Sequence, residues 1–531
     1  MSFLDRFRKP AAPAASADLV AAREQAEIER HKLEAMVMQG RRQALERAYD
    51  AATPSQYWNR PGDLKSGNAV MDHARWKLRS WARHLDENHD LAIGVLDDIV
   101  KKVIGCGIQV TPCVKRAGGQ LHVEANKALS RLWSEWCTAM PESTRTLPWP
   151  QVEAMVCRSV YRDGEMLIQH LEGNAPITHR SRVPYSIELI EADYLPFELM
   201  RESSASQNRI VHGVELTDWR EPVAFWVYRE HPGDIGIQNF TGAGLAAAAD
   251  VKRVSADVLT HIKFTRRLGQ VRGVSILHGV LRRLEDIKEY EESERVAARI
   301  AAAMCAVITK STDFAGGGTL NDAGNRTMEM NPGMIFDNLL PGESVSMIGS
   351  DRPNTNLENF RNSQMRGVAS GTGTSYSGIS RNYNGTYSSQ RQELVETWVG
   401  YELMREYLYG AFYRPIWQRF VRMAFAAGLV SRAGIDLQTL FDVDFVGPAM
   451  PWIDPVKEVE AKVAAINAGL TSRHMAIRES QMDPALVDEQ IESDPLRDIL
   501  KPPPAAAPAP APAKAKQDTP DPQDATAAAA A

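Results

Sequence analysis

The chain contains few cysteines and no pairing pattern among them. Five cysteines occur in 531 residues, and no two of them stand at CxxC spacing. An odd count without such pairs argues against a disulfide framework and against a zinc site, and is typical of a protein from a reducing compartment. We therefore expect each cysteine to be a small buried side chain. They are Cys106, Cys113, Cys137, Cys157 and Cys305.

The chain also lacks an excess of positive charge. Its 61 lysines and arginines stand against 67 aspartates and glutamates, which gives a formal net charge of −6. A protein that holds DNA through its phosphates usually carries a basic face, because phosphate contacts provide most of the affinity. The composition therefore excludes a globally basic DNA-binding protein. If this protein meets DNA, we expect a loose contact that allows sliding.

No long apolar run is present. No window of about 18 residues is predominantly apolar and free of charge, so no transmembrane helix and no membrane partner are expected. Hydrophobic residues make up 44% of the chain and charged residues 24%. These values are typical of a globular protein, and the length is sufficient for several domains.

Catalytic motifs are missing as well. The chain contains no GxxxxGK[ST] sequence, which excludes a Walker-type ATP site. The nearest match to a GxSxG nucleophile elbow is Gly373-Thr-Ser375-Tyr-Ser377, in which a serine stands where the last glycine is required. We expect no catalytic residue, no cofactor and no metal ion.

An acidic cluster leaves one enzymatic alternative open. Acids are dense between Glu285 and Glu294, and a metal-dependent nuclease would use two or three carboxylates to hold metal ions. A nuclease site, however, draws its acids from different elements, whereas these follow one predicted helix with basic residues among them. The favoured interpretation is an exposed face with i,i+4 ion pairs such as Glu291–Arg295.

Periodicity predicts an α+β fold. Helices are expected at 18–50, 69–103, 122–138, 149–161, 274–310, 354–368, 391–427, 455–470 and 472–499. Strands are expected at 108–112, 165–170, 185–190, 210–216, 222–228, 327–330 and 333–336. The helix at 274–310 would be about 55 Å long at the usual rise per residue, a length that suits the wall of an assembly. Residues 371–389 are rich in Gly, Ser, Tyr and Asn and predict a long loop.

Several short motifs follow one another between about residue 160 and residue 475, and the most specific of them is Gly269-Gln-Val-Arg272-Gly-Val-Ser275. In this order the motifs resemble the lambda family of tailed-bacteriophage portal proteins, in which the most specific one precedes the stem helix. The others are Asp163-Gly-Glu165, Leu189-Ile-Glu191-Ala-Asp193, Ile379-Ser-Arg381-Asn-Tyr383, Tyr387-Ser-Ser-Gln-Arg391, Asp454-Pro-Val-Lys-Glu458 and Gly469-Leu-Thr-Ser-Arg473. Residues 369–377 depart from the family pattern, with Thr372 in place of an apolar residue and Ser377 in place of an acid.

The resemblance implies a portal fold, with an α/β wing, a long-helix stem, a small clip and a helical crown, in a ring-forming subunit. By order along the chain, its parts are an N-terminal arm and helix (1–59), the wing (60–273), stem helix 1 (274–310), the clip (311–351), stem helix 2 (352–370), the tunnel loop (371–390), a long helix that returns to the wing (391–454), the crown (455–500) and a disordered Pro/Ala-rich tail (501–531).

The resemblance also implies a function and a set of partners. Portal proteins form a ring, generally of twelve subunits, at one capsid vertex, through which double-stranded DNA is packaged and ejected. The expected partners are other copies of the chain, the large terminase subunit, the major capsid protein or scaffold, head-completion and connector proteins, and the DNA in the channel. The expected location is the virion, after assembly in the host cytoplasm.

Two groups of residues are the candidate site. The candidate residues of the tunnel loop, which would face DNA in the channel, are Ser375, Tyr376, Ser377, Arg381, Asn382, Tyr383 and Asn384. The candidate residues of the stem helix, which would face the channel or a neighbouring subunit, are Arg282, Arg283, Lys288, Glu292, Arg295 and Arg299. No enzymatic role is predicted. The alternatives are the metal-dependent nuclease and a different capsid scaffold protein.

Overall fold

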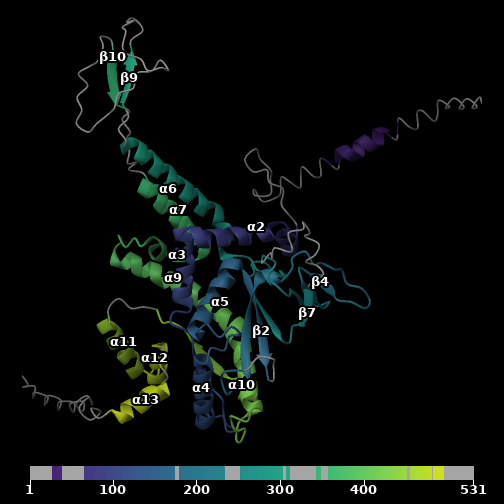
Figure 1. Ribbon diagram of the computed structural model, residues 1–531, viewed down its shortest axis with the longest axis vertical. Helices are drawn as coiled ribbons and strands as arrows, with labels where there is room; N and C mark the ends of the chain where they lie inside the picture. Colours follow the sequence, from purple (N-terminus) through teal and green to yellow (C-terminus); the bar gives the residue numbers. More distant parts are fainter. Residues whose placement is uncertain are drawn as a thin grey trace, which may run out of the picture. The chain divides into compact units, whose positions relative to one another are not determined.

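The computed structural model describes residues 25–38 except 26 and 37, 65–173, 179–233, 251–302, 306–310, 343–347, 357–450, and 455–494 except 481 and 483. The chain divides into two units, residues 1–66 and residues 67–531. In the first unit, residues 27–36 are helical and exposed, which confirms that part of the helix expected at 18–50. All other elements belong to the second unit (Figure 1).

The second unit begins with two helices where the sequence predicts one. Helix α2 spans Gly67–Asn88 and α3 spans Asp90–Val103. The break occurs at His89, whose extended backbone ends α2 and whose Nδ1 accepts a hydrogen bond from the Leu91 N–H. His89 is buried, and its Nε2 lies 2.8 Å from the carbonyl oxygen of Leu284. His89 therefore lies inside the fold, where one helix ends and the next begins.

Two further helices and a three-stranded sheet form the centre of the unit. Helices α4 (Val123–Thr138) and α5 (Trp149–Asp163) confirm the predicted helices. Strands β2 (Glu165–Glu172), β3 (Tyr185–Glu191) and β8 (Leu259–Lys263) form an antiparallel sheet in the order β3-β2-β8. Helix α5 leads directly into β2 through Gly164 in a left-handed conformation. Strand β8 was not predicted.

The chain between β3 and β8 forms a four-stranded antiparallel sheet. Its strands are β4 (Arg209–Val211), β5 (Val214–Leu216), β6 (Pro222–Tyr228) and β7 (Val251–Ser255), in that order. The single strand predicted at 210–216 is a hairpin, because His212 and Gly213 both adopt positive φ angles and turn the chain. That pair is a typical two-residue hairpin turn. Strand β7 was also missed.

Aromatic side chains fill the main core. Trp136 stacks on Tyr185 with ring centroids 5.5 Å apart, and its indole N–H donates to the Tyr185 carbonyl oxygen at 2.8 Å. Trp133 contacts Trp136 and also Trp417, which comes from a helix almost 300 residues later in the chain. Large aromatic surfaces contribute much of the stability of such a core. Their contacts here hold together helices that are far apart in the sequence.

A carboxyl group is buried next to this aromatic core. Glu153, on α5, accepts a hydrogen bond from the Ile108 N–H at 3.4 Å, and its other oxygen has no hydrogen-bond partner among the described residues. Burial raises the pKa of Glu153 to about 7. The carboxyl group is therefore protonated in the folded protein at pH values where it is ionised in the unfolded chain.

We expect Glu153→Gln to flatten the dependence of stability on pH. Because the pKa of Glu153 is higher in the folded protein than in the unfolded chain, protonation of Glu153 stabilises the folded state. This stabilisation is complete below the pKa of the unfolded chain and is lost as the pH rises toward 7. For wild type the loss attributable to Glu153 between pH 4.5 and 8 is about 3 kcal/mol. Urea unfolding at both pH values measures it. Glu124→Gln, at an exposed position of α4, is the control, and it should show the same difference in free energy of unfolding between the two pH values as wild type.

The predicted stem helix is shorter than expected. A 3-10 turn, η6 (Ile276–Gly279), precedes α6 (Leu281–Ala302), and Ala306–Lys310 is strand β9. Strand β9 pairs antiparallel with β10 (Glu343–Met347). The prediction of a helix to residue 310 was wrong because the sequence Val-Ile-Thr at 307–309 is β-branched and favours a strand. Helix α6 is about 33 Å long rather than 55 Å.

Most of the predicted long loop is helical. Helix α7 spans Leu357–Thr372, α8 spans Tyr376–Ser380, and α9 begins at Tyr387 and ends at Leu408. Only 373–375 and 381–386 lie outside helices, which corrects the loop expected at 371–389. Gly, Ser and Asn suggested a loop, but Ser375 and Thr386 are N-caps, a position that favours these residue types.

Helix α9 continues without interruption into the next helix. A π-helical turn, η7 (Tyr409–Tyr413), joins it to α10 (Arg414–Ala426). The helix predicted at 391–427 is thus confirmed, with an earlier start. Pro415 is tolerated because it stands in the first turn of α10, directly after the π-helical turn, where the missing N–H costs little.

The C-terminal part returns to the start of the second unit and then becomes helical. After the short turn η8 (Leu437–Thr439), strand β11 (Val443–Val446) pairs antiparallel with β1 (Gln109–Pro112). Helices α11 (Pro455–Asn467), α12 (Arg473–Glu479) and α13 (Pro484–Ser493) follow. The helix predicted at 472–499 is therefore two shorter helices.

Some predictions fall outside the described residues or need correction. The strands expected at 327–330 and 333–336, most of the clip, the Pro/Ala-rich tail and Cys305 lie outside the described part of the chain. Cys157 is buried as expected and Cys113 and Cys137 are half-buried, but Cys106 is exposed, because it follows the end of α3 in an irregular turn. Among the described helices, none is long and apolar enough to span a membrane.

Candidate functional site

Three of the sequence motifs meet in one buried cluster of charged residues. Asp163 and Glu165 flank the junction of α5 and β2, Asp193 lies in the 3-10 turn η3 (Ala192–Tyr194), and Arg272 lies just before η6. Helix α2 adds Arg79 and Arg83. We call these six residues the arginine cluster. It joins the sheet, α2 and the start of α6.

Arg272 is the centre of the cluster and is completely buried. Its Nε lies 2.8 Å and 2.9 Å from the two carboxylate oxygens of Glu165. Its remaining N–H groups donate to backbone carbonyl oxygens of Ala192, Leu195 and His212 at 3.0–3.2 Å. The guanidinium lies 3.8 Å from the centroid of the Phe197 ring. All sides of the cation are thus occupied by protein groups.

Glu165 is the matching anion. It accepts hydrogen bonds from Arg272, from Arg79 at 2.7 Å, from the Gly273 N–H at 3.0 Å and from His261 Nε2 at 2.9 Å. Burial alone would raise the pKa of Glu165, but the charge of Arg272 and the hydrogen bond from His261 outweigh it and hold the pKa well below its usual value. The pKa of His261 is lowered by burial, so this histidine is a neutral donor.

The outer part of the cluster is similarly paired. Arg83 binds both oxygens of Asp163 at 2.9–3.0 Å and also contacts Asp193. Burial would raise the pKa of Asp163, but hydrogen bonds from Arg162 and Arg83 lower it. These bidentate contacts are among the strongest that side chains make. Because each carboxylate of the cluster is bound by arginine, none is available to act as a base or to hold a metal ion.

Two glycines allow two backbone segments of the cluster to approach closely. Gly164 has a φ of +89°, and a Cβ atom there would lie 2.4 Å from the carbonyl carbon of Val274. A Cβ atom on Gly273 would lie 1.8 Å from the carbonyl oxygen of Gly164. The two backbones therefore touch at a point where only glycine fits. Arg272, which precedes Gly273, is held at this contact.

The acids of α6 do not form a metal site in the described part of the chain. The expected intrahelical pair Glu291–Arg295 is replaced by an ion pair between Glu291 and Arg361 of α7. Three ligand atoms, from Glu191, Asp193 and His231, lie within 4.8 Å of one another elsewhere. Asp193 is already bound by Arg79 and Arg83, so a cation would face two guanidinium groups there.

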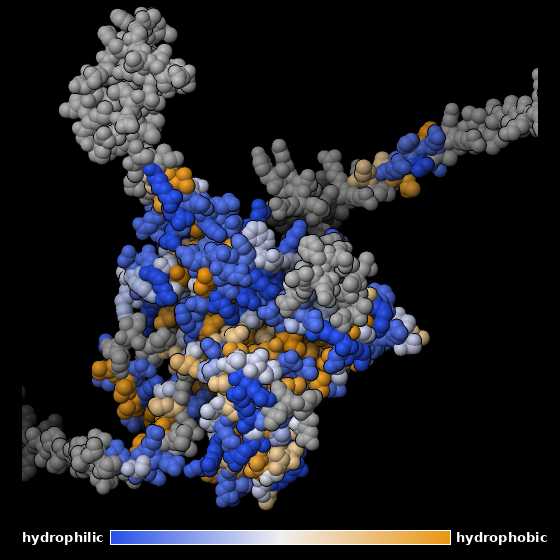
Figure 2. Space-filling model, viewed as in Figure 1, coloured by the Kyte–Doolittle hydropathy of each residue, from blue (hydrophilic) through white to orange (hydrophobic). Residues whose placement is uncertain are grey.

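Most of the candidate residues of the stem helix are exposed on α6. Leu281, Leu284 and Ile287 bury one side of α6, and Tyr290 packs on Phe360 of α7 with ring centroids 4.8 Å apart. Figure 2 shows that the surface in this region is largely hydrophilic. Arg282, Arg283, Glu292, Arg295 and Arg299 are exposed and Lys288 is half-buried. Whether they face a channel or a neighbour stays a prediction.

The candidate residues of the tunnel loop divide into two sets. Ser375 is buried, and its hydroxyl oxygen caps α8 by accepting a hydrogen bond from the Gly378 N–H at 2.9 Å. The Ser377 N–H donates to Glu393 at 2.9 Å, and Tyr376 lies under the guanidinium of Arg366. These three residues are therefore fixed to the body of the unit.

The second set lies on an exposed tip. Arg381 adopts a left-handed conformation with a φ of +55° and ends α8. Asn382 is half-buried, and Arg381, Tyr383 and Asn384 are exposed. The exposed surface continues to residue 389. The structure thus separates a fixed part of the predicted loop, 373–380, from an exposed tip, 381–389.

Sequence reasoning missed the groups that hold the fixed part. The hydroxyl of Tyr401, on α9, accepts a hydrogen bond from the Ser375 N–H at 3.0 Å and donates to Asp98 of α3 at 2.5 Å. Lys102 pairs with Asp98 at 2.9 Å and lies 5.0 Å from the centroid of the Tyr401 ring. Asp98 and Lys102 stand four residues apart on a helix, which is the one signal that the sequence offers.

We expect Tyr401→Phe to loosen the segment 373–386. The substitution removes a hydrogen bond to a carboxylate and leaves the Ser375 N–H without its partner, at a cost of about 2 kcal/mol. Hydrogen–deuterium exchange of peptides from 373–386 should accelerate by about 30-fold, the equivalent of that energy, while peptides from α4 stay unchanged. Tyr387→Phe, at an exposed tyrosine, is the matched control. Equal exchange in both variants would contradict the account.

The chain is similar to one family of known proteins and to individual relatives. The family described as phage portal protein, lambda family, matches residues 53–405. A probable portal protein of Halomonas phage phiHAP-1 is 24% identical over 454 residues, covering 82% of this chain and 83% of that protein. Portal protein B of Escherichia phage lambda is 23% identical over 232 residues, covering 38% of this chain and 44% of that protein.

A chain from the neck of a native gene transfer agent particle, computed with C12 symmetry, aligns with a TM-score of 0.45 and 12% identity. The alignment covers 76% of this chain and 92% of that one.

Proposed function

Because the chain belongs to the lambda family of phage portal proteins, we propose that it assembles into a closed ring at one vertex of the capsid, and that double-stranded DNA enters and leaves through this ring. The parts of the subunit keep the names that the family resemblance gave them. The wing comprises the described residues between 65 and 273, the stem the helices α6 and α7, and the crown the helices α11 to α13. Strand β10 would belong to the clip, and β9, at the end of the range expected for stem helix 1, would join the clip because it pairs with β10.

The paired helices α6 and α7 carry this proposal. Their contact combines the Tyr290–Phe360 ring packing with the Glu291–Arg361 ion pair. The exposed residues of α6 mix both signs of charge: Arg282, Arg283, Arg295 and Arg299 with Asp286, Glu289 and Glu292. Such a surface binds water well and offers nearly balanced charge. A channel wall of this kind stays hydrated without holding the phosphates of the duplex, because strong phosphate binding needs an excess of positive charge.

The exposed tip 381–389 is the proposed DNA-facing part. Arg381 is its only charged residue, and its other side chains are mostly hydroxyl and amide groups. These groups form hydrogen bonds with phosphate oxygens that fix no base sequence. The fixed residues Ser375, Tyr376 and Ser377 would position the tip instead of contacting DNA. This narrows the predicted tunnel loop to its second half.

The partners follow from the same proposal. The clip would bind the large terminase subunit, the wing and stem would meet the major capsid protein or scaffold, and head-completion and connector proteins would bind after packaging. The location would be the virion, with assembly in the host cytoplasm. ATP hydrolysis would belong to the terminase, since the sequence has no Walker motif and the carboxylates of the arginine cluster are bound by arginine.

Photo-crosslinking in DNA-filled particles tests the DNA-facing role. A photoreactive residue at Tyr383, on the tip, should crosslink to packaged DNA. The control is Trp219, which is 94% exposed on a loop of the proposed wing and should not label DNA. Crosslinking at Tyr383 in filled but not in empty particles is the expected result. No labelling at Tyr383, or equal labelling at both positions, would contradict the proposed role of the tip.

A further inference from the structure

The outward face of α9 carries an exposed apolar row. Val395, Val399 and Leu403 stand four residues apart, and their exposed fractions are 41%, 56% and 69%. Residues at this spacing form a ridge, and such ridges pack into the groove of another helix. An isolated subunit therefore leaves open a surface of the type that helices use to pair.

Acidic residues flank this row. Glu396, Glu402 and Glu406 are exposed on the same face, and none of them takes part in an ion pair among the described residues. Arg405, on the same helix, is buried and donates to the carbonyl oxygens of Val103 and Lys102. The exposed face of α9 from 392 to 406 thus carries three carboxylates and no cation. We call it the α9 face.

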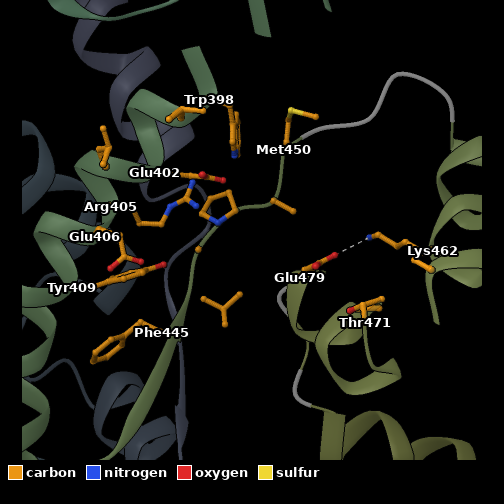
Figure 3. Close-up of a pocket in the computed structure, with 18 of the residues that line it drawn as sticks. Trp398, Glu402, Arg405, Glu406, Tyr409, Phe445, Met450, Lys462, Thr471 and Glu479 are labelled. Atoms are coloured by element: carbon orange, nitrogen blue, oxygen red, sulfur yellow. Dashed lines mark ion pairs between the residues drawn. The ribbon is translucent and has the colours of Figure 1, made fainter. Parts of the chain in front are cut away.

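The α9 face forms one wall of a cleft of about 920 Å³ (Figure 3). The opposite wall includes Ala461, Ala465 and Leu470, on and just after α11. In Figure 3, Trp398, Glu402 and Tyr409 lie on the α9 side, and Lys462 and Glu479 lie across the opening. The cleft is large enough to receive an aromatic side chain beside Val399 and Leu403, because a buried aromatic residue fills only a fraction of this space.

Helix α2 presents a face of opposite charge. Val70, Lys77, Trp81 and His84 are exposed, and their spacings of seven, four and three residues place them on one side of the helix. The ring of Trp81 packs edge-on against His84 at 5.8 Å. We call these four residues the α2 face; none of them is acidic, and the exposed Glu87 lies three residues beyond His84 at the end of the helix. The α2 face combines an aromatic anchor with positive charge.

We propose that α2 of one subunit packs its α2 face on the α9 face of the neighbouring subunit. This inference rests on the proposed ring. A closed ring uses two different faces of each subunit, one for each neighbour, and the two faces must complement each other. The α2 face and the α9 face match in apolar content and oppose each other in charge. Trp81 enters beside Leu403, and Lys77 faces the carboxylates of α9.

Charge selects this pairing over the other exposed row. Helix α11 also exposes Val456, Val459 and Val463, so it offers an alternative apolar partner for α9. The exposed Glu460 lies beside that row. It would bring a further carboxylate toward Glu396, Glu402 and Glu406, and like charges at an interface are unfavourable. The α2 face brings Lys77 instead.

A charge exchange tests the pairing. Glu402→Lys alone and Lys77→Glu alone should each raise the protein concentration for half-maximal ring assembly by about 10-fold or more, which corresponds to about 1.4 kcal/mol for one lost charge contact. The double variant should return to within about 3-fold of wild type, because the pair is restored with its charges exchanged. The control is Glu124→Lys, at an exposed position on α4, and it should assemble like wild type. Mass photometry over a concentration series gives the midpoints.

A disulfide provides a second test that does not depend on charge. Trp81→Cys combined with Leu403→Cys should give a ladder of covalent oligomers on oxidation, and neither single variant should do so. Exposed Cys106 is present in all of these chains, so the single variants also control for it. Wild-type rings together with no rescue and no ladder would overturn the pairing of α2 with α9 while leaving the ring intact. A wild-type protein that never forms rings would instead refute the proposed function.

Discussion

Replacing Arg272 by alanine is expected to destabilise the second unit by about 3–5 kcal/mol. The substitution leaves Glu165 buried without its main cation, and it leaves the carbonyl oxygens of Ala192, Leu195 and His212 without their donor. Such a loss is a large part of the total stability of a typical domain, so much of the protein should be insoluble or unfolded at 37 °C. Chemical denaturation monitored by tryptophan fluorescence measures it.

The control for Arg272 is another arginine removed from the surface. Arg282→Ala, ten residues later on the exposed side of α6, should change the stability by no more than about 0.5 kcal/mol. Replacing Arg272 by lysine should recover little, because one ammonium group cannot supply the several directed donors of the guanidinium. An Arg272→Ala protein with the same unfolding midpoint as Arg282→Ala would refute the assignment of Arg272 as the centre of the cluster.

Gly273→Ala is expected to have the second large effect, although it adds only one methyl group. The new Cβ would lie 1.8 Å from the Gly164 carbonyl oxygen, and backbone at this contact can yield only by separating the two segments. That separation would also break the hydrogen bond from the Gly273 N–H to Glu165. We expect a loss of more than about 4 kcal/mol, in the range that only a few mechanisms produce.

Gly94→Ala is the matched control for this substitution. Gly94 lies within α3, and a Cβ atom there would meet no atom within 4 Å. Because alanine is the better helix former, this variant should be more stable by up to about 1 kcal/mol. The midpoint of thermal unfolding should therefore be lower than that of wild type for Gly273→Ala and higher for Gly94→Ala. A Gly273→Ala protein that melts at the wild-type temperature would show that the close contact is absent in solution.

The arginine cluster explains why several motifs of the sequence occur together. Arg272 stands just before the helices that form the proposed stem, and its contacts reach β2, η3 and the His212 turn. The direction in which α6 leaves the wing is thus fixed by a buried ion network. A channel built from many copies needs this direction to be the same in each subunit, since errors would accumulate around the ring. These motifs hold the wing to the start of α6.

The sequence predicted most elements that depend on local pattern. Helices α4 and α5, the continuous helix of α9, η7 and α10, and strands β2, β3 and β6 follow from apolar periodicity, and their bounds agree within a few residues. The family resemblance identified Arg272 and Glu165 as parts of motifs, but not as partners. Their pairing joins residues 107 apart, so no local pattern could reveal it.

The errors of the sequence-based predictions have equally specific causes. Residues 306–310 continue an apolar stripe, and the prediction followed this stripe into a helix although Val307, Ile308 and Thr309 are β-branched and favour the strand that pairs with β10. Ser375 and Thr386 suggested a loop by composition, whereas Ser375 caps α8 and Thr386 caps α9. Tertiary contacts from Tyr401 and Glu393 of α9 also hold the start of α8. The sequence indicated that most arginines of α6 are exposed, but it could not reveal that Glu291 pairs with Arg361 of α7, because the two residues are 70 positions apart.

The central claim is that this chain handles DNA by enclosing it in a ring of its own copies. Electron microscopy of the purified full-length protein tests it most directly, in class averages taken at several salt concentrations. The account predicts closed rings of uniform subunit number with a central opening wide enough for a DNA duplex, and no strong binding of duplex to their outer surface. A protein that stays monomeric at every salt and protein concentration, or that forms only open filaments, would contradict it.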